Sequence, residues 1–131
     1  MIFGIGTDLV EVRRIKRLWE SYGTRFSQRI LMPEELSDFK TSRDPVRYLA
    51  MRFAVKESVV KALGTGFHHG MWVRDTGSVP DARGRPLVIF SERGKAVCRA
   101  MGAGDAFVSL SDEAGMVLAM AVIMKVSTST V

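Results

Sequence analysis

The chain has 131 residues and a formal net charge of +5, with 47% hydrophobic and 25% charged residues. This length suits a single domain covering residues 1–131, and no apolar run approaches the roughly 20 residues of a membrane-spanning helix. We therefore expect no membrane-spanning helix. The positive charge favours an anionic partner, but it does not choose among nucleic acid, phosphorylated small molecules and acidic proteins.

Two features bear on cellular location. The first residues, MIFGIGTDLV, lack a basic leader followed by a long apolar stretch, so they indicate mature structure and not a signal peptide. The single cysteine, Cys98, cannot form an intrachain disulfide, and its apolar neighbours predict a small buried thiol on a helix. We therefore expect a cytoplasmic protein without membrane association.

The first twelve residues alternate as those of a β-strand do. One face of this strand carries Phe3, Ile5, Thr7 and Leu9, and the other carries Gly4, Gly6 and Asp8. This second face therefore has two positions without a side chain next to one carboxylate. Either the glycines mark a bulge or a close crossing of another element, or they clear space for something that Asp8 binds.

Residues 12–22 follow a helical period, with an apolar face that includes Trp19. The opposite face carries Arg13, Arg14, Lys16 and Arg17, with Glu20 as its only acid. A solvated charged face is the simple explanation, yet four cations against one anion favour an acidic partner. Further along the chain, Arg25 and Arg29 extend the basic region.

The remaining elements complete an α+β pattern. A short helix follows Pro33, and a long helix begins with Asp44 as its N-cap and Pro45 in its first turn, and ends at Gly64. After it come two strands over MWVRDTGSV and RPLVIF, a helix over roughly residues 91–101, and a hairpin of DAFVSLS and GMVLAMAVIMK. The predicted order is strand, three helices, two strands, helix, two strands. This order gives an antiparallel sheet packed with one long helix and shorter helices.

Within the long helix, the stretch RFAVKESVVKALGTG (residues 52–66) places Glu57 in an apolar arc, with Lys61 one turn later. A buried, ionised carboxylate is costly unless it is paired or binds a metal. For the helix taken alone, an ion pair between Glu57 and Lys61 at i,i+4 spacing is the simpler explanation. A metal site is the alternative.

The surroundings of Glu57 favour the metal. The turn Gly64-Thr65-Gly66 frees backbone N–H groups to approach an anion, and Lys56 and Lys61 add charge beside it, although most such turns are simple helix stops. Asp8 and Glu57, on separate elements, suit Mg²⁺, which takes few protein carboxylates and completes its coordination with phosphate and water. The sequence therefore predicts a magnesium site beside a phosphate-binding region.

Five segments, in order along nearly the whole chain, resemble the holo-[acyl carrier protein] synthases, the small bacterial 4'-phosphopantetheinyl transferases. They are GIGTDLVEVRRI at 4–15, RFSQRILMPEEL at 25–36, RFAVKESVVKALGTG at 52–66, GRP at 84–86 and VSLSDE at 108–113. The resemblance implies the 4'-phosphopantetheinyl transferase fold, a homotrimer with active sites between subunits, and coenzyme A as donor. The implied reaction is Mg²⁺-dependent transfer of 4'-phosphopantetheine to a serine of apo acyl carrier protein in fatty acid biosynthesis, with release of adenosine 3',5'-bisphosphate.

The same resemblance assigns roles to individual residues. Asp8 and Glu57 match the Mg²⁺ ligands, and Glu57 and Lys61 are the implied catalytic residues. The implied coenzyme A contacts are Lys61, Gly64, Thr65 and Gly66 near the diphosphate, Arg52 near the 3'-phosphate, and Arg85 and Pro86 near the adenine, with Lys56 as an added cation. The positions that match the carrier-protein docking surface are Arg14, Arg25 and Phe26.

Some positions depart from the family pattern or leave a question open. Phe107 and Asp112 stand where many members carry histidines, and the histidine replaced by Phe107 helps to hold the 3'-phosphate, so Arg52 is expected to carry more of that contact. His68 and His69 are interpreted as a solvated pair. The group that accepts the serine proton is either Glu57 or a metal-bound water.

Two other functions fit parts of the sequence. A small RNA-binding module would explain the positive charge and Trp19 beside arginines, but Trp19 lies on the apolar face, where it is expected to be buried and unable to stack on bases. No nucleic-acid partner is therefore expected. A noncatalytic oligomeric scaffold would use its carboxylates only in ion pairs, and it predicts no response to Mg²⁺ or coenzyme A.

Overall fold

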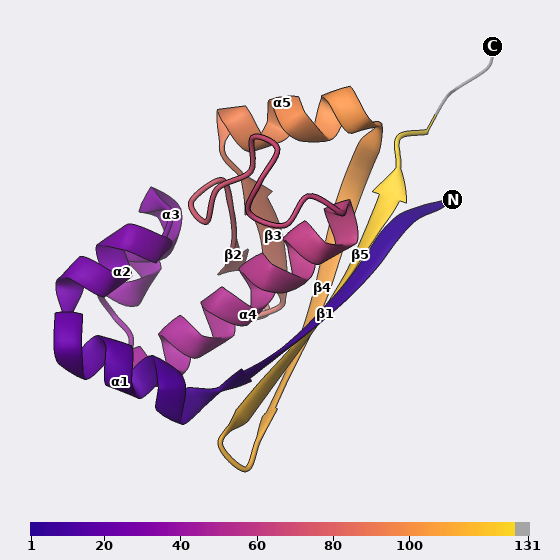
Figure 1. Ribbon diagram of the computed structural model, residues 1–131. Coiled ribbons are helices and arrows are strands. Elements are labelled where there is room, and N and C mark those ends of the chain that lie inside the picture. Colours follow the sequence, from indigo (N-terminus) through magenta and orange to yellow (C-terminus); the bar gives the residue numbers. More distant parts are fainter. Residues whose placement is uncertain (128–131) are drawn as a thin grey trace.

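A computed structural model of the protein describes residues 1–127 as a long helix packed across a three-stranded antiparallel sheet, with a two-stranded hairpin beside it (Figure 1). The elements in this range are β1 (Ile2–Glu11), α1 (Val12–Tyr22), α2 (Thr24–Ile30), α3 (Pro33–Phe39), α4 (Pro45–Leu63), β2 (Thr76–Pro80), β3 (Pro86–Phe90), α5 (Glu92–Met101), β4 (Ala103–Glu113) and β5 (Met116–Lys125). None of these helices is both long enough and apolar enough to cross a membrane.

The predicted α+β class is confirmed, and the predicted order of elements needs one addition. The short helix α2 was not expected, because it follows Gly23 without any side chain to cap it. The strand expected from Met71 begins only at Thr76. The backbone N–H of Asp75 donates to the carbonyl of Trp72 at 2.9 Å, so this part of the chain closes a turn before β2 starts.

The sheet has the strand order β1-β5-β4, and α4 crosses the face on which the glycines of β1 lie. A Cβ atom built at Gly4 would collide with the carbonyl oxygen of Ala62, and one built at Gly6 would collide with that of Ser58. Close crossing of another element is therefore the right explanation for these glycines. As a result, Asp8, which lies on the same face of β1, is held close to the helix.

Two apolar clusters form the interior around α4. One joins the C-terminal half of α4 to the sheet and to α5, and its buried members include Val59, Leu63, Cys98 and Ile123. The other joins α4 to α1 and α2, with Ile15, Ile30, Leu31 and Leu49 among its members. Cys98 is a buried thiol on a helix, as predicted, and burial raises its pKa. Trp19 is half-buried and packs edge-on against Phe39, with 5.7 Å between ring centroids, so its predicted burial is partial.

The face of the sheet opposite α4 carries exposed apolar side chains, here called the outer sheet face. Its members are Ile5, Leu9, Phe107, Leu118 and Met120, whose exposed fractions range from 44% to 62%. The strand register places Ile5 and Phe107 on either side of Val122, and Leu9 opposite Leu118. Such a patch of large apolar groups is typical of a surface that another molecule covers.

Candidate functional site

The predicted metal ligands come together where β1 crosses α4. The Asp8 side chain is 14% exposed, and the Glu57 carboxylate is partly buried on α4. Burial raises the pKa of Glu57, and the negative charge of Asp8 raises it further, while Lys61 and Arg14 act in the opposite direction. The net pKa shift is upward, with burial as its largest cause and the nearby Asp8 carboxylate as the second.

Lys61 forms an ion pair with Asp8. Its Nζ atom lies 3.1 Å from Asp8 Oδ1 and donates to the carbonyl of Thr7 at 3.0 Å, while about half of the Lys61 side chain stays exposed. The simple alternative of an ion pair between Glu57 and Lys61 is therefore wrong, because Lys61 pairs with Asp8 instead. Because Asp8, Glu57 and Lys61 adjoin one another, the site combines two carboxylates with a half-exposed cation.

The donor set of this site fits Mg²⁺. No group of three or more His, Cys, Asp or Glu side chains able to hold a metal gathers anywhere within residues 1–127. Two carboxylates alone suit Mg²⁺, which keeps several waters and binds substrate phosphates besides one or two protein carboxylates. A divalent cation between Asp8 and Glu57 would also relieve the repulsion that raises the pKa of Glu57.

The turn after α4 caps the helix instead of offering free amides. The backbone N–H groups of Gly64, Thr65 and Gly66 all donate to the carbonyl of Val60, at 3.0, 3.1 and 3.2 Å. The Thr65 hydroxyl lies 2.8 Å from the carbonyl of Gly66, to which it donates. The expectation that this turn frees N–H groups for an anion is therefore wrong, and the helix-stop interpretation is right. Gly64 and Gly66 have positive φ angles of 81° and 57°, which explains their identity.

Lys56 is not available to a ligand at the surface. Its side chain is fully buried and lies 2.5 Å from Glu35 Oε1 and 2.6 Å from the carbonyl of Thr76. Burial lowers the pKa of the Lys56 ammonium, and the Glu35 carboxylate opposes that shift. The expectation that Lys56 adds charge beside coenzyme A is therefore corrected: its charge is already neutralised inside the fold.

One cavity of the structure, here called the arginine cavity, is lined by Arg52, Arg85 and Pro86. It has a volume of about 530 Å³ and lies between α4, the β2–β3 hairpin and β4, with Met51, Pro80, Gly84, Val108, Ser109 and Leu110 as its other lining residues. The Arg52 guanidinium lies 4.5 Å from the centre of the Tyr48 ring and 3.5 Å from an oxygen of Asp38. Its buried Nε has no hydrogen-bond partner within residues 1–127, so it retains a donor.

The two positions at which the family carries histidines lie apart from the arginine cavity. Phe107 is 48% exposed and belongs to the outer sheet face. Asp112 pairs with Arg47, in the first turns of α4, at 2.5 Å between Oδ2 and Nε. This contact lowers the pKa of the Asp112 carboxyl. His68 and His69 are both exposed, in agreement with the expected solvated pair.

The predicted docking residues border the carboxylates. A cavity of about 160 Å³, here called the carboxylate cavity, is lined by Asp8, Glu57, Arg14 and Phe26, together with Leu9, Val10, Ile15, Leu18, Ile30 and Phe53. A neighbouring cavity of about 340 Å³ adds Arg25 to Phe26. On α1, Lys16 pairs with Glu20 and Arg13 with Glu11, whereas Arg14 and Arg17 have no ion pair within the described chain.

A comparison with known protein families identifies the superfamily to which this chain belongs. The model of the 4'-phosphopantetheinyl transferase superfamily matches residues 4–112, which include the Asp8, Glu57 and Arg52 positions. This chain belongs to that superfamily.

Individual members of the superfamily agree over almost the whole chain. The holo-[acyl-carrier-protein] synthase of Halorhodospira halophila is 44% identical over 124 residues, covering 95% of this chain and 98% of that protein. The crystal structure of the synthase from Neisseria meningitidis has a TM-score of 0.91 and 42% identity, covering 95% of this chain and 100% of the other. The Helicobacter pylori synthase, solved in complex with coenzyme A, has a TM-score of 0.79 and 27% identity over 91% of this chain and 98% of its own. The resemblance to holo-[acyl carrier protein] synthases, the transferase fold and the assignment as an enzyme of this kind are confirmed.

Sequence reasoning missed Glu35, whose carboxylate accepts three buried hydrogen bonds in this transferase. In the sequence, Glu35 is only one of two acids in the first turn of the short helix after Pro33, and acids are favourable at any helix N-terminus. Glu35 is fully buried and accepts hydrogen bonds from Lys56 and from the backbone of Met32 and Ser78. A signal was present in the sequence: Lys56 shares its helix segment with Val55, Val59 and Val60, so a charge buried among them needed a buried anion.

Proposed function

We propose that the protein transfers the 4'-phosphopantetheine group of coenzyme A to a serine of apo acyl carrier protein and releases adenosine 3',5'-bisphosphate. The observation that carries this proposal is the meeting of Asp8 and Glu57 in a cavity whose rim holds Arg14 and Phe26. In a member of this superfamily, two facing carboxylates suit a metal-assisted reaction at a diphosphate, and the exposed cations of α1 suit an acidic protein substrate.

The reaction is a phosphoryl transfer, which depends on positioning and charge neutralisation more than on covalent help. The serine oxygen attacks the phosphorus that carries the pantetheine arm. The bond from that phosphorus to the bridging oxygen breaks, and the leaving group is adenosine 3',5'-bisphosphate. Lys61, half exposed on α4, turns from Asp8 toward the diphosphate and stabilises the charge that develops there.

Asp8 and Glu57 would hold Mg²⁺, which neutralises charge on the diphosphate when bound. Glu57 lines the cavity that the serine would enter, and we propose it as the acceptor of the serine proton. The contact of Gly64, Thr65 and Gly66 with the diphosphate stays a prediction from the family pattern.

Arg52, Arg85 and Pro86 bind the nucleotide end of coenzyme A in this proposal. The arginine cavity offers two guanidinium groups and apolar walls, which is the composition that an adenosine carrying a 3'-phosphate requires. Arg14, Arg25 and Phe26 receive the carrier protein beside the carboxylates, so that its serine enters the carboxylate cavity.

The working form is proposed to be a homotrimer. The lining residues of the arginine cavity and of the carboxylate cavity do not overlap, which suits an active site completed between subunits. The outer sheet face supplies the apolar surface for such an assembly. Ile5→Arg should give monomers in sedimentation velocity, whereas Met101→Arg, at an exposed apolar residue on α5, should sediment like the wild type. An unchanged assembly in Ile5→Arg would place the interface elsewhere.

Location in the cytoplasm and a role in fatty acid biosynthesis belong to the same proposal. The single buried cysteine suits a reducing compartment, and acyl carrier protein is the substrate named for the relatives.

Replacement of the two carboxylates tests the proposed reaction. Asp8→Asn and Glu57→Gln should each lower the rate of adenosine 3',5'-bisphosphate release by at least about 100-fold, because each removes a metal ligand while keeping the side-chain shape. Asp105→Asn, at an exposed acid on β4, is the matched control and should turn over normally. Near-normal turnover of either site variant in Mg²⁺ would show that the metal assignment is wrong.

A further inference from the structure

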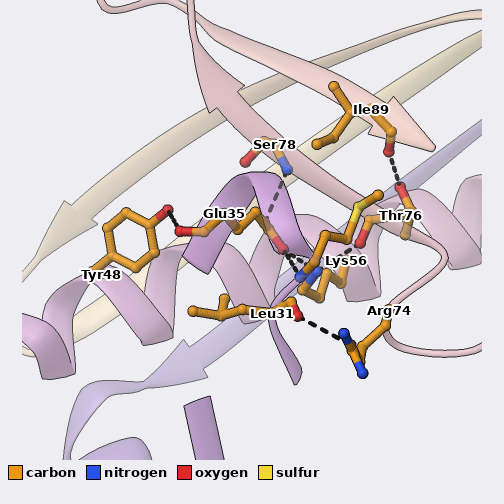
Figure 2. A network of polar contacts seen from close by, with 9 residues as sticks. Leu31, Glu35, Tyr48, Lys56, Arg74, Thr76, Ser78 and Ile89 are labelled. Atoms are coloured by element: carbon orange, nitrogen blue, oxygen red, sulfur yellow. Dashed lines mark hydrogen bonds and ion pairs between the residues drawn. The ribbon is translucent and has the colours of Figure 1, made fainter. Parts of the chain in front are cut away.

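A buried ion pair ties together the three elements α3, α4 and β2. Figure 2 shows Glu35 of α3 and Lys56 of α4 pointing at each other, with β2 above them. Glu35 Oε1 accepts from Lys56 Nζ at 2.5 Å and from the Met32 N–H at 3.0 Å, and Oε2 accepts from the Ser78 N–H at 3.0 Å. Lys56 Nζ also donates to the Thr76 carbonyl at 2.6 Å. Both side chains have no exposed surface.

Stability alone does not explain this pair. Removing two charges from water costs several kcal/mol per ion, and replacing a buried pair with apolar groups of similar volume is often neutral or stabilising. What such a pair does provide is a fixed geometry, because each charge must meet its partner at one distance. Gly77 shows how closely β2 is held: a Cβ atom there would lie 2.5 Å from Glu35 Cδ.

On one side, the pair fixes the position of Arg52 through α3. Asp38 follows Glu35 by one helical turn and lies 3.5 Å from the Arg52 guanidinium. The Tyr48 hydroxyl donates to the backbone carbonyl of Glu35 at 3.0 Å, and the Tyr48 ring lies under Arg52. The positions of Asp38 and Tyr48, the two neighbours that orient Arg52, therefore depend on the position of Glu35.

On the other side, the pair fixes the β2–β3 hairpin that carries Arg85. The Ser78 N–H and the Thr76 carbonyl of β2 contact the pair directly, and the Thr76 hydroxyl donates to the Ile89 carbonyl of β3 at 3.1 Å. The hairpin then continues through Pro80 to the turn before Arg85, where the Asp81 carboxylate accepts from the Arg85 N–H at 2.9 Å. Glu35 thus connects both arginine-bearing walls of the cavity.

We propose that Glu35, paired with Lys56, is a positioning residue that sets Arg52 and Arg85 at the separation needed to grip the nucleotide end of coenzyme A. This inference rests on the proposed function, and it assigns Glu35 and Lys56 a role in substrate affinity without contact with the substrate. Asp8 and Glu57 meet through the packing of β1 on α4, and Arg14 lies on α1. The positions of these three residues therefore do not depend on the β2–β3 hairpin. The effect is therefore specific to coenzyme A and spares the carrier protein.

The experiment compares Lys56→Met with the neutral double variant Glu35→Gln/Lys56→Met. Lys56→Met leaves Glu35 as a buried charge without its cation, so its melting temperature should fall, whereas the double variant should regain much of that loss. In both, KM for coenzyme A should rise about tenfold or more, because a displacement on the order of 1 Å in a binding group costs that much or more. KM for apo carrier protein should stay at the wild-type value.

The control is Val55→Ala, at a fully buried neighbour of Lys56 on α4. It lowers the melting temperature through a cavity without touching the pair, so its KM for coenzyme A should match the wild type. Recovery of KM together with melting temperature in the double variant would overturn the proposal, as would an equal rise in KM in Val55→Ala. If Lys56→Met does not fold, Glu35→Gln alone decides, because it keeps the shape of the side chain; a wild-type KM in that variant overturns the positioning role.

Calorimetric titration of coenzyme A into the same proteins separates this inference from the proposed function. A wild type that binds coenzyme A but fails to modify any carrier protein refutes the transfer reaction. Weaker binding by the neutral double variant would then still support the positioning role, and equal binding would refute it.

Discussion

Gly6 is the residue whose replacement tests most directly how β1 delivers Asp8 to α4. A Cβ atom at Gly6 would lie 2.6 Å from the Ala62 backbone nitrogen and closer still to the Ser58 carbonyl oxygen. Ordinary van der Waals contacts are about 3.5 Å, so β1 and α4 must separate by about 1 Å or more in Gly6→Ala. Backbone atoms of a helix cannot move aside as a flexible side chain can, and Asp8 is only two residues away.

Two consequences follow for the Gly6→Ala variant. Overpacking of this size costs about 1 to 3 kcal/mol in the free energy of unfolding. A displacement of Asp8 by about 1 Å relative to Glu57 should lower kcat/KM by about 100-fold. Thr7→Ala is the matched control, because the Thr7 side chain is exposed on the opposite face of the same strand and only its backbone carbonyl contacts Lys61.

The assay for Gly6→Ala combines urea unfolding with initial rates of phosphopantetheine transfer at saturating Mg²⁺. If the close packing of β1 on α4 positions Asp8, Gly6→Ala must lose rate even at temperatures where it is fully folded. A folded Gly6→Ala variant with turnover within about twofold of Thr7→Ala would show that the closeness of β1 and α4 does not set the geometry of the carboxylates.

Two further outcomes are expected at other sites. Arg14→Glu, on the rim of the carboxylate cavity, should raise KM for the carrier protein at least about tenfold at low salt and less at high salt, with KM for coenzyme A unchanged; equal effects on both KM values would remove Arg14 from the docking surface. Asp75→Asn tests the turn before β2: burial alone would raise the Asp75 pKa, but hydrogen bonds from Arg93, Ser91 and the Trp72 N–H lower it below its ordinary 3.8. The free energy of unfolding of the wild type should therefore exceed that of Asp75→Asn by about 2 kcal/mol above roughly pH 5. This difference should shrink as the pH falls through the lowered pKa of Asp75. A pH-independent difference in urea unfolding would contradict that cause.

Features with local causes were predictable from the sequence. The period of residues 12–22 predicted α1, and the Asp44 N-cap with Pro45 predicted the start of α4. Asp8 and Glu57 were paired on their chemistry alone, and the structure brings them into one cavity. These inferences depend on side chains acting within a few residues or on the needs of a metal.

Features that depend on a distant partner were not predictable in the same way. Lys56 and Lys61 look alike in the sequence, yet α3 supplies a buried anion for Lys56, whereas β1 supplies a partly exposed one for Lys61. The amides of Gly64, Thr65 and Gly66 looked free because the sequence does not show that one carbonyl, that of Val60, accepts all three. In each case the missing information is the tertiary position of a single acceptor.

Transfer of phosphopantetheine from coenzyme A to an acyl carrier protein is the reaction proposed for the Asp8 and Glu57 site. Intact-mass spectrometry of apo carrier protein incubated with the wild-type protein, coenzyme A and Mg²⁺ tests it most directly. The carrier protein should gain the mass of one phosphopantetheine group at its serine, and omission of Mg²⁺ with a chelator should abolish the gain. An unmodified carrier protein in the complete mixture, with the transferase folded and coenzyme A intact, would refute the proposed reaction.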